Sequence, residues 1–168
     1  MSLDAARETE QRVLGQLDEL NAWYEVIECD PALADTENFC KHYDVPLDRS
    51  ANCIVVASRS EPKAYCACLV LSTDRLDVNR TVRRLMGVRK ASFAPAEETA
   101  ELTGMLIGGV TPFALPPDLP LYVDRSVTER EWVVVGGGSR SQKLKVRPDV
   151  FERLPNAKVI DGLAMEAS

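Results

Sequence analysis

The chain of 168 residues, 45% hydrophobic and 27% charged, is long enough to bury the core of one domain. Its formal net charge of −6 argues against a general affinity for nucleic acids, and no apolar run is long enough to span a membrane. The acidic, amphipathic N-terminus does not resemble a signal peptide, so we expect a cytoplasmic protein.

The numbers and spacing of cysteine and histidine limit which metal sites and catalytic groups the chain can contain. The five cysteines show no C-x-x-C spacing, which favours buried, reduced thiols. The single histidine, His42, excludes zinc sites that need two histidines and leaves little room for a histidine-based triad. Any catalysis has to be supplied largely by other groups.

The first part of the chain begins with a helix and a strand. Apolar residues at helical spacing predict a helix over 2–20, and residues 23–28 alternate as a strand does. Asp35 or Thr36 then caps a short helix that ends at Tyr43.

Two apolar stretches, 51–57 and 64–71, predict a central strand hairpin. Asn52 is the polar exception. Because a buried amide must find partners, Asn52 either bonds to backbone or water, or directs a donor and an acceptor into a pocket.

Basic residues gather in the second half, and the pattern over 76–86 predicts a helix capped by Asp77 and ended by Gly87. Its arginines lie off the apolar face and form either a solvated surface or a phosphate-binding one. They are Arg80, Arg83 and Arg84.

The remaining elements mix without a regular β-α-β rhythm. They are strands over 88–93, 119–124, 131–135, 142–147 and 157–160, and helices over 95–104 and 148–154, before a frayed tail. We therefore predict an α+β fold: a single domain over 1–168 with a mixed, barrel-like sheet and surrounding helices.

Residues 104–120 are the least ordinary segment, because their glycines and prolines are interleaved with apolar residues. Glycine permits unusual backbone angles and close approach of a ligand, while proline stiffens the chain. The spacing from Gly108 to Pro112 suggests a rigid loop that offers backbone N–H groups to a ligand. The alternative is a buried connection that only covers the core.

Two further places are ambiguous. The run 136–138 lacks the G-x-G-x-x-G spacing of a phosphate loop, so it is either a hairpin turn or a turn whose N–H groups face a ligand. Asp124 ends a predicted strand, where it either caps a turn with Ser126 or faces the same pocket.

A series of motifs resembles the YbaK family, the editing domain associated with prolyl-tRNA synthetase and its free-standing relatives. The matching segments, in the order typical of the family, cover about 36–154. They are ANCIVV (51–56), DRLD (74–77), LMGVRKASF (85–93), EETAELTG (97–104), GGVTPFAL (108–115), LPLYVD (119–124) and VGGG (135–138).

The resemblance implies a barrel-like α+β fold and hydrolysis of the ester of mischarged tRNA that carries a small amino acid, with no metal or cofactor. The loop would hold the scissile carbonyl and stabilise the oxyanion, and a small pocket would exclude the larger, correct amino acid. The expected catalytic loop residues are Gly108, Gly109, Thr111 and Pro112. The expected substrate-binding residues are Asn52, Asp124, Gly136, Gly137, Arg75 and Lys143, with Arg80, Arg83 and Arg84 on tRNA phosphates.

One position departs from the family's pattern. Well-known members carry a lysine in the first central strand that helps to position the acceptor end, and the flanking residues align it with Asn52. An amide cannot make a charge-assisted bond to phosphate. The chain is then a subgroup of other specificity, a deacylase in which Arg75 or Lys143 supplies the charge, or a non-catalytic member. Such a member would bind an acceptor end or an aminoacyl-tRNA synthetase; a hydrolase of simple aminoacyl esters is a third hypothesis.

Overall fold

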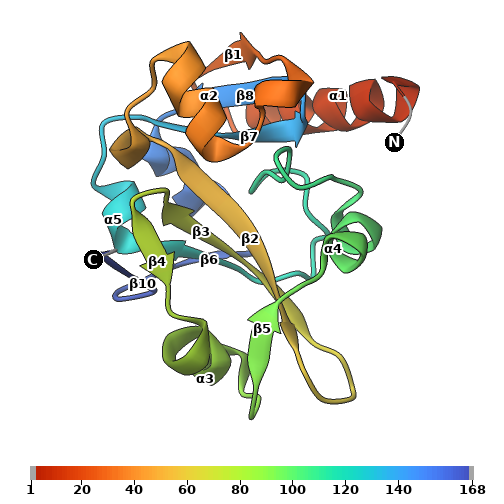
Figure 1. The fold of residues 1–168 in the computed structure, drawn as a ribbon, viewed down its shortest axis with the longest axis vertical. Helices are drawn as coiled ribbons and strands as arrows, with labels where there is room; N and C mark the ends of the chain where they lie inside the picture. The colour runs from red at the N-terminus through yellow and green to blue at the C-terminus, as the bar shows by residue number, and fades with distance from the viewer. Residues whose placement is uncertain (1–2, 167–168) are drawn as a thin grey trace.

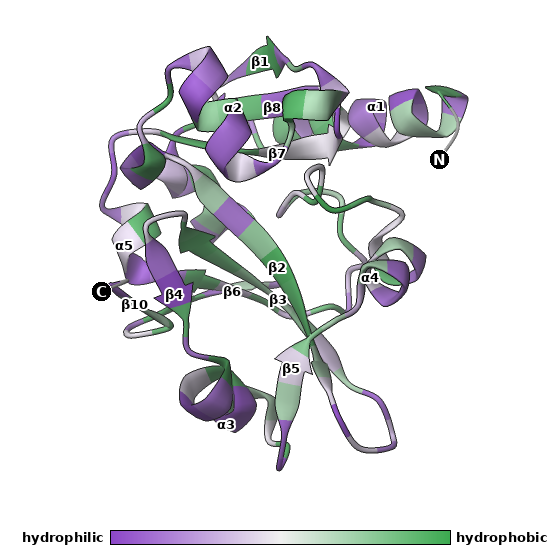
Figure 2. Ribbon diagram, in the orientation of Figure 1, coloured by the Kyte–Doolittle hydropathy of each residue, from purple (hydrophilic) through white to green (hydrophobic). Residues whose placement is uncertain are grey.

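The computed structural model describes residues 3–166, and within them a mixed five-stranded sheet has the order β5-β2-β3-β6-β9 (Figure 1). Its strands are β2 (Ala51–Ser58), β3 (Tyr65–Leu71), β5 (Ala91–Phe93), β6 (Leu121–Asp124) and β9 (Ala157–Ile160). The pair β2 and β3 is antiparallel, which confirms the predicted hairpin, while β3-β6 and β6-β9 are parallel. Figure 2 shows β3 as hydrophobic through most of its length, as expected of a central strand.

A second, antiparallel sheet in the described part of the chain has the order β1-β8-β7. Its strands are β1 (Tyr24–Glu28), β7 (Val133–Ser139) and β8 (Gln142–Val146). Helix α1 (Leu3–Glu19) packs on β7, and its Val13 and Leu17 are fully buried in the same core as β3 and β6. A bridge between Ser50 and Val134 joins the two sheets next to the start of β2.

Shorter helical elements cover the sheets. Helix α2 (Thr36–Tyr43) places Phe39 and Cys40 in a cluster with Val134 on the second sheet. Five more are η1 (Pro31–Leu33), η2 (Leu47–Arg49), α4 (Ala96–Thr103), α5 (Arg125–Thr128) and η4 (Pro148–Arg153). Together with the two sheets they form an α+β fold. Within residues 3–166, no helix is long and apolar enough to cross a membrane.

The helix predicted over 76–86 is a composite instead. Strand β4 (Asp74–Leu76) precedes a π-helical segment, η3 (Val78–Val82), and only α3 (Arg83–Met86) is α-helical. The backbone N–H of Val82 donates to the carbonyl of Asp77, five residues back, and the Thr81 hydroxyl donates to the Asp77 carboxylate. Gly87 ends the segment at φ +69°, as predicted.

Two other elements differ from expectation. Strand β10 (Ala164–Glu166), in the segment expected to fray, pairs with β4. The run Gly136–Gly138 belongs to β7, so the hairpin turn falls after it, at Arg140 and Ser141.

Candidate functional site

A cavity of about 350 Å³ opens between α2, β2, α4, the strands β7 and β8, and the segment 104–120, which we call the Gly/Pro loop. It exists because β5 pairs only with Val56, Ala57 and Ser58, which leaves the first half of β2 without a neighbour on that edge. The wall is largely apolar. Polar side chains in it include those of Asp35, Thr36, Asn52, Cys53, Thr99 and Lys143.

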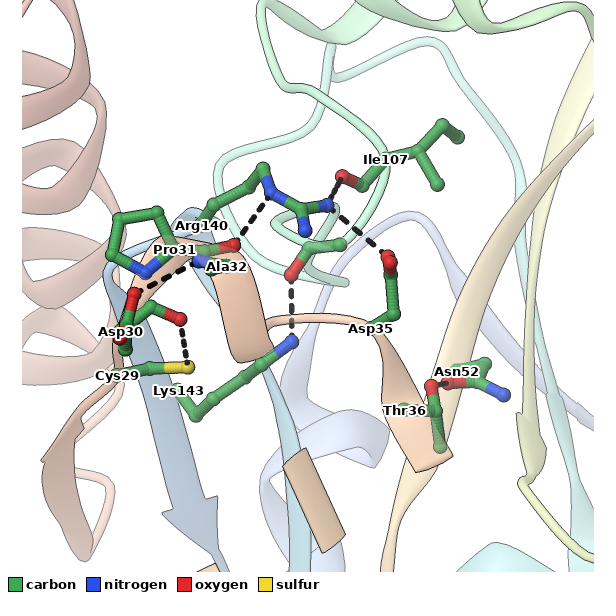
Figure 3. Close-up of polar contacts among 11 residues, drawn as sticks. Cys29, Asp30, Pro31, Ala32, Asp35, Thr36, Asn52, Ile107, Arg140 and Lys143 are labelled. Atoms are coloured by element: carbon green, nitrogen blue, oxygen red, sulfur yellow. Dashed lines mark hydrogen bonds and ion pairs between the residues drawn. The ribbon is translucent and has the colours of Figure 1, made fainter. Parts of the chain in front are cut away.

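The Gly/Pro loop is held at the cavity by two cationic side chains of the β7-β8 hairpin (Figure 3). Lys143 Nζ donates to the carbonyl of Gly108 at 2.6 Å, and Arg140 Nη1 donates to the carbonyl of Ile107 at 2.7 Å. Arg140 also pairs with Asp35 at 3.1 Å and donates through Nε to Pro31. Two successive carbonyls of the loop are therefore fixed from the same side.

Glycines allow the loop to lie against β7. A Cβ at Gly136 would overlap the carbonyl of Val110, and a Cβ at Gly109 would meet the backbone of Ser139. The N–H of Gly138 donates to the carbonyl of Gly109 at 2.8 Å. The glycine run in β7 thus serves close backbone packing against the loop, which only glycine permits.

Lys143 is unusual because it is a buried cation, with 8% of its surface exposed. Burial is the largest cause of a lowered pKa for its amine, and the nearby Arg140 lowers it further. The amine also lies 5.4 Å from the ring centroid of Phe39. Since an ammonium has three N–H donors and one is used on Gly108, two remain for a ligand in the cavity.

This pKa shift predicts a pH-dependent contribution to stability. Because the unfolded chain holds the Lys143 proton more tightly than the folded chain, stability should rise with pH toward the ordinary lysine value of 10.5. We expect the unfolding free energy of the wild type minus that of Lys143→Met to increase as the pH rises toward the ordinary lysine value of 10.5. Denaturant titrations at several pH values measure it, and a flat difference would contradict the shift.

Asn52 is oriented by its neighbour on α2. Its Oδ1 accepts a hydrogen bond from the Thr36 hydroxyl at 2.7 Å. Within residues 3–166, this is the hydrogen bond recorded for the Asn52 side chain, so its Nδ2 is left to donate to a ligand in the cavity.

Other predicted site residues lie elsewhere. Of the predicted loop residues, Gly108 lines the cavity, whereas Gly109, Thr111 and Pro112 are buried behind it. Gly136 lines the cavity, but Gly137 is buried, and its carbonyl accepts from the side chain of Gln142.

Asp124 caps α5 by accepting from the N–H and hydroxyl of Ser126, and it accepts from the N–H of Ala164. Arg75 is exposed on β4. The arginines of η3 and α3 lie at the opposite end of the molecule from α2 and β8 in Figure 1. They are Arg80, Arg83 and Arg84, and their contact with phosphates remains a prediction.

Comparison with known protein families shows to which family the chain belongs. The model of the family described as "Aminoacyl-tRNA editing domain" matches residues 30–154, which include every residue that lines the cavity. The chain belongs to the aminoacyl-tRNA editing domain family. Helix α1 lies outside the matched segment of this editing domain.

Individual proteins resemble the editing domain to different extents. The uncharacterized protein YwhH of Bacillus subtilis is 27% identical over 135 residues, covering 80% of this chain and 83% of YwhH. A proline–tRNA ligase of Paraburkholderia phymatum is 27% identical over 107 residues, which are 63% of this chain but only 18% of the ligase. The crystal structure of a candidate trans-editing enzyme for prolyl tRNA synthetase aligns with a TM-score of 0.77 and 25% identity, covering 95% of this chain and 98% of that one.

Proposed function

We propose that this editing-domain protein is an aminoacyl-tRNA deacylase, which hydrolyses the ester of a mischarged tRNA carrying a small amino acid. The observation that carries the proposal is the meeting of Gly108, the amine of Lys143 and the amide of Asn52 at one cavity. The Lys143 amine and the Asn52 amide supply N–H donors from two different strands, and Gly108 brings the loop backbone to the same space. Such preorganised donors stabilise the oxyanion that forms during ester hydrolysis.

The size and lining of the cavity support a small amino acid. A volume of about 350 Å³ is near the lower end of ligand pockets, and it has to hold the ester as well as the side chain. Much of the wall is formed by side chains of the two packed sheets, Val55 of β2 and Val134 and Val135 of β7 among them. Such walls reject a larger substrate by overlap, as a second sieve does.

Lys143 can supply the positive charge that the amide of Asn52 cannot. It reaches the cavity from β8, so a cation is present although the first central strand carries Asn52. Arg75 is exposed on β4, outside the cavity lining. We therefore assign to Lys143 the charge that binds the developing oxyanion or the adjacent phosphate, and to Asn52 Nδ2 a donor to the substrate.

The proton transfers do not require a protein histidine in this proposal. His42, the single histidine, is exposed on α2 and does not line the cavity. In this proposal a hydroxyl of the terminal ribose assists attack by water, while the loop and Lys143 hold the carbonyl. Binding of the tRNA end then brings part of the catalytic machinery with the substrate.

Cys53 lines the cavity but is not assigned a chemical role. Burial raises the pKa of its thiol to about 12, so the thiolate that a nucleophilic cysteine needs is scarce near neutral pH. We expect Cys53→Ala to retain ester hydrolysis within about threefold. Single-turnover rates of both proteins measure this, and a loss above about tenfold would place the thiol in the reaction.

The proposal is tested by turnover of tRNA charged with a small amino acid, using the wild type beside Asn52→Lys. Release by the wild type well above the spontaneous rate supports the deacylase. Release by Asn52→Lys alone would favour the alternative, in which the natural protein binds an acceptor end or a synthetase without catalysis. Behind that alternative lies Asn52, which stands where the family resemblance leads us to expect a lysine.

A further inference from the structure

Strand β8 carries a row of cations on one face. Lys143 and Lys145 occupy alternate positions of β8, and Arg147 continues the alternation in extended backbone just after the strand ends, so the three side chains leave the same side of the sheet. Lys143 lies in the cavity, Lys145 is partly buried and Arg147 is exposed. The row thus leads from the cavity to the molecular surface.

Aromatic rings accompany this row. The amine of Lys145 lies 4.3 Å from the ring centroid of Trp132, and the guanidinium of Arg147 lies 4.7 Å from that of Trp23. Arg49, on η2, lies 5.1 Å from the same Trp132 ring. Trp23 is 39% exposed, an unusual position for so large an apolar side chain. We call these five residues the β8 basic surface.

The cations of the β8 basic surface lack carboxylate partners. Within residues 3–166, the recorded ion pairs involve Arg125, Arg130, Arg140 and Arg153, but none of the three cations of this surface. Glu25 lies opposite Lys145 in the β1-β8 ladder without forming an ion pair with it. The Nη1 atom of Arg49 is buried and has no hydrogen-bond partner in the described part of the chain. On a chain of net charge −6, this is a local cluster of cations, of which Arg147 is exposed to an anionic ligand and Lys145 and Arg49 are partly buried.

We propose that the β8 basic surface binds the single-stranded acceptor end of tRNA while the ester lies in the cavity. This inference rests on the proposed function. Lysine and arginine side chains bind phosphates with release of counterions, and exposed aromatic rings stack unpaired bases. A flexible RNA end needs such contacts next to the cavity, because they hold the ester in place. These contacts do not require recognition of double-stranded RNA.

The test is the dissociation constant for an uncharged tRNA, measured with Lys145→Glu/Arg147→Glu. The matched control is Arg89→Glu/Lys90→Glu, which makes the same change in charge at two exposed residues just before β5. We expect the β8 variant to raise the dissociation constant about 10- to 100-fold and the control to change it less than threefold. The slope of log K against log salt should fall by about 1.4 to 1.8, as for two lost phosphate contacts.

A second RNA identifies the part of the ligand that is bound. With the single-stranded 3′ end removed from the tRNA, wild type and β8 variant should bind equally. Lys145→Gln/Arg147→Gln removes the charges without reversing them, and it should show a smaller loss in the same direction if the Glu variant fails to fold.

Because binding of uncharged tRNA does not require hydrolysis, failure of this inference and failure of the deacylase proposal give different results. An effect of the β8 variant equal to that of the control would overturn the inference, as would a loss seen only with Arg80→Glu/Arg84→Glu. Unchanged tRNA affinity with lost binding of a synthetase would also overturn it, because the surface would then serve a protein partner.

Discussion

Lys143→Ala lowers the rate of ester hydrolysis by about 100- to 1000-fold, the loss typical of removing one oxyanion donor. The expectation follows from the position of the amine. It is buried at the cavity, uses one donor on the Gly108 carbonyl and keeps two for the substrate. The measurement is a single-turnover rate with saturating protein, which separates chemistry from binding.

Two comparisons distinguish a chemical role of Lys143 from a structural one. Lys41→Ala changes an exposed lysine on α2 and should alter the rate less than threefold. A small alkylammonium ion added to Lys143→Ala should restore part of the rate, because the truncation leaves room for it in the cavity. Full activity of Lys143→Ala would remove the lysine from the mechanism.

Gly108→Ala is expected to lower the same rate by about 100-fold or more. Gly108 has φ +92°, which L side chains rarely adopt, and its added Cβ would overlap Nη1 of Arg140. The arginine would leave the Ile107 carbonyl, and the Gly108 carbonyl would shift from Lys143. A displacement of this kind near the reacting atoms costs rate through orientation alone.

Gly87→Ala is the matched control for Gly108→Ala. Gly87 has a similar backbone conformation, φ +69°, but a Cβ there meets nothing within 4 Å, and it ends α3 away from the cavity. Both variants should lose on the order of 1 kcal/mol of stability from backbone strain, whereas only Gly108→Ala should lose activity. Equal activity of the two would mean that the loop geometry does not matter for hydrolysis.

Local patterns were sufficient to predict most of the fold. Apolar runs located the β2-β3 hairpin. Gly87 and Gly104, which adopt the left-handed backbone conformation, marked the ends of α3 and α4. The pairing of β10 with β4 was missed because a strand of three residues carries no periodic signal and is stabilised by a distant partner. The π-helical turn was missed for a similar reason, since Asp77 is held by the carbonyl of Leu163 near the other end of the chain.

The site was only partly predictable. Asn52, Gly108, Gly136 and Lys143 were among the expected site residues, and all four line the cavity. Asp124 and Arg75 were expected with them but lie outside the lining. The burial of Lys143 could not be read from its strand, because the cover over that face comes from α2. Arg140 was missed because its role depends on carbonyl groups of η1 and the loop, which no local pattern brings together.

The most direct test of the deacylase proposal is a panel of matched tRNAs charged with alanine, cysteine, serine, threonine or proline. The proposal predicts fast loss of at least one small amino acid, with prolyl-tRNA spared because the cavity excludes the larger residue. Rates equal to the spontaneous rate for every ester would contradict it, even if the protein bound each tRNA.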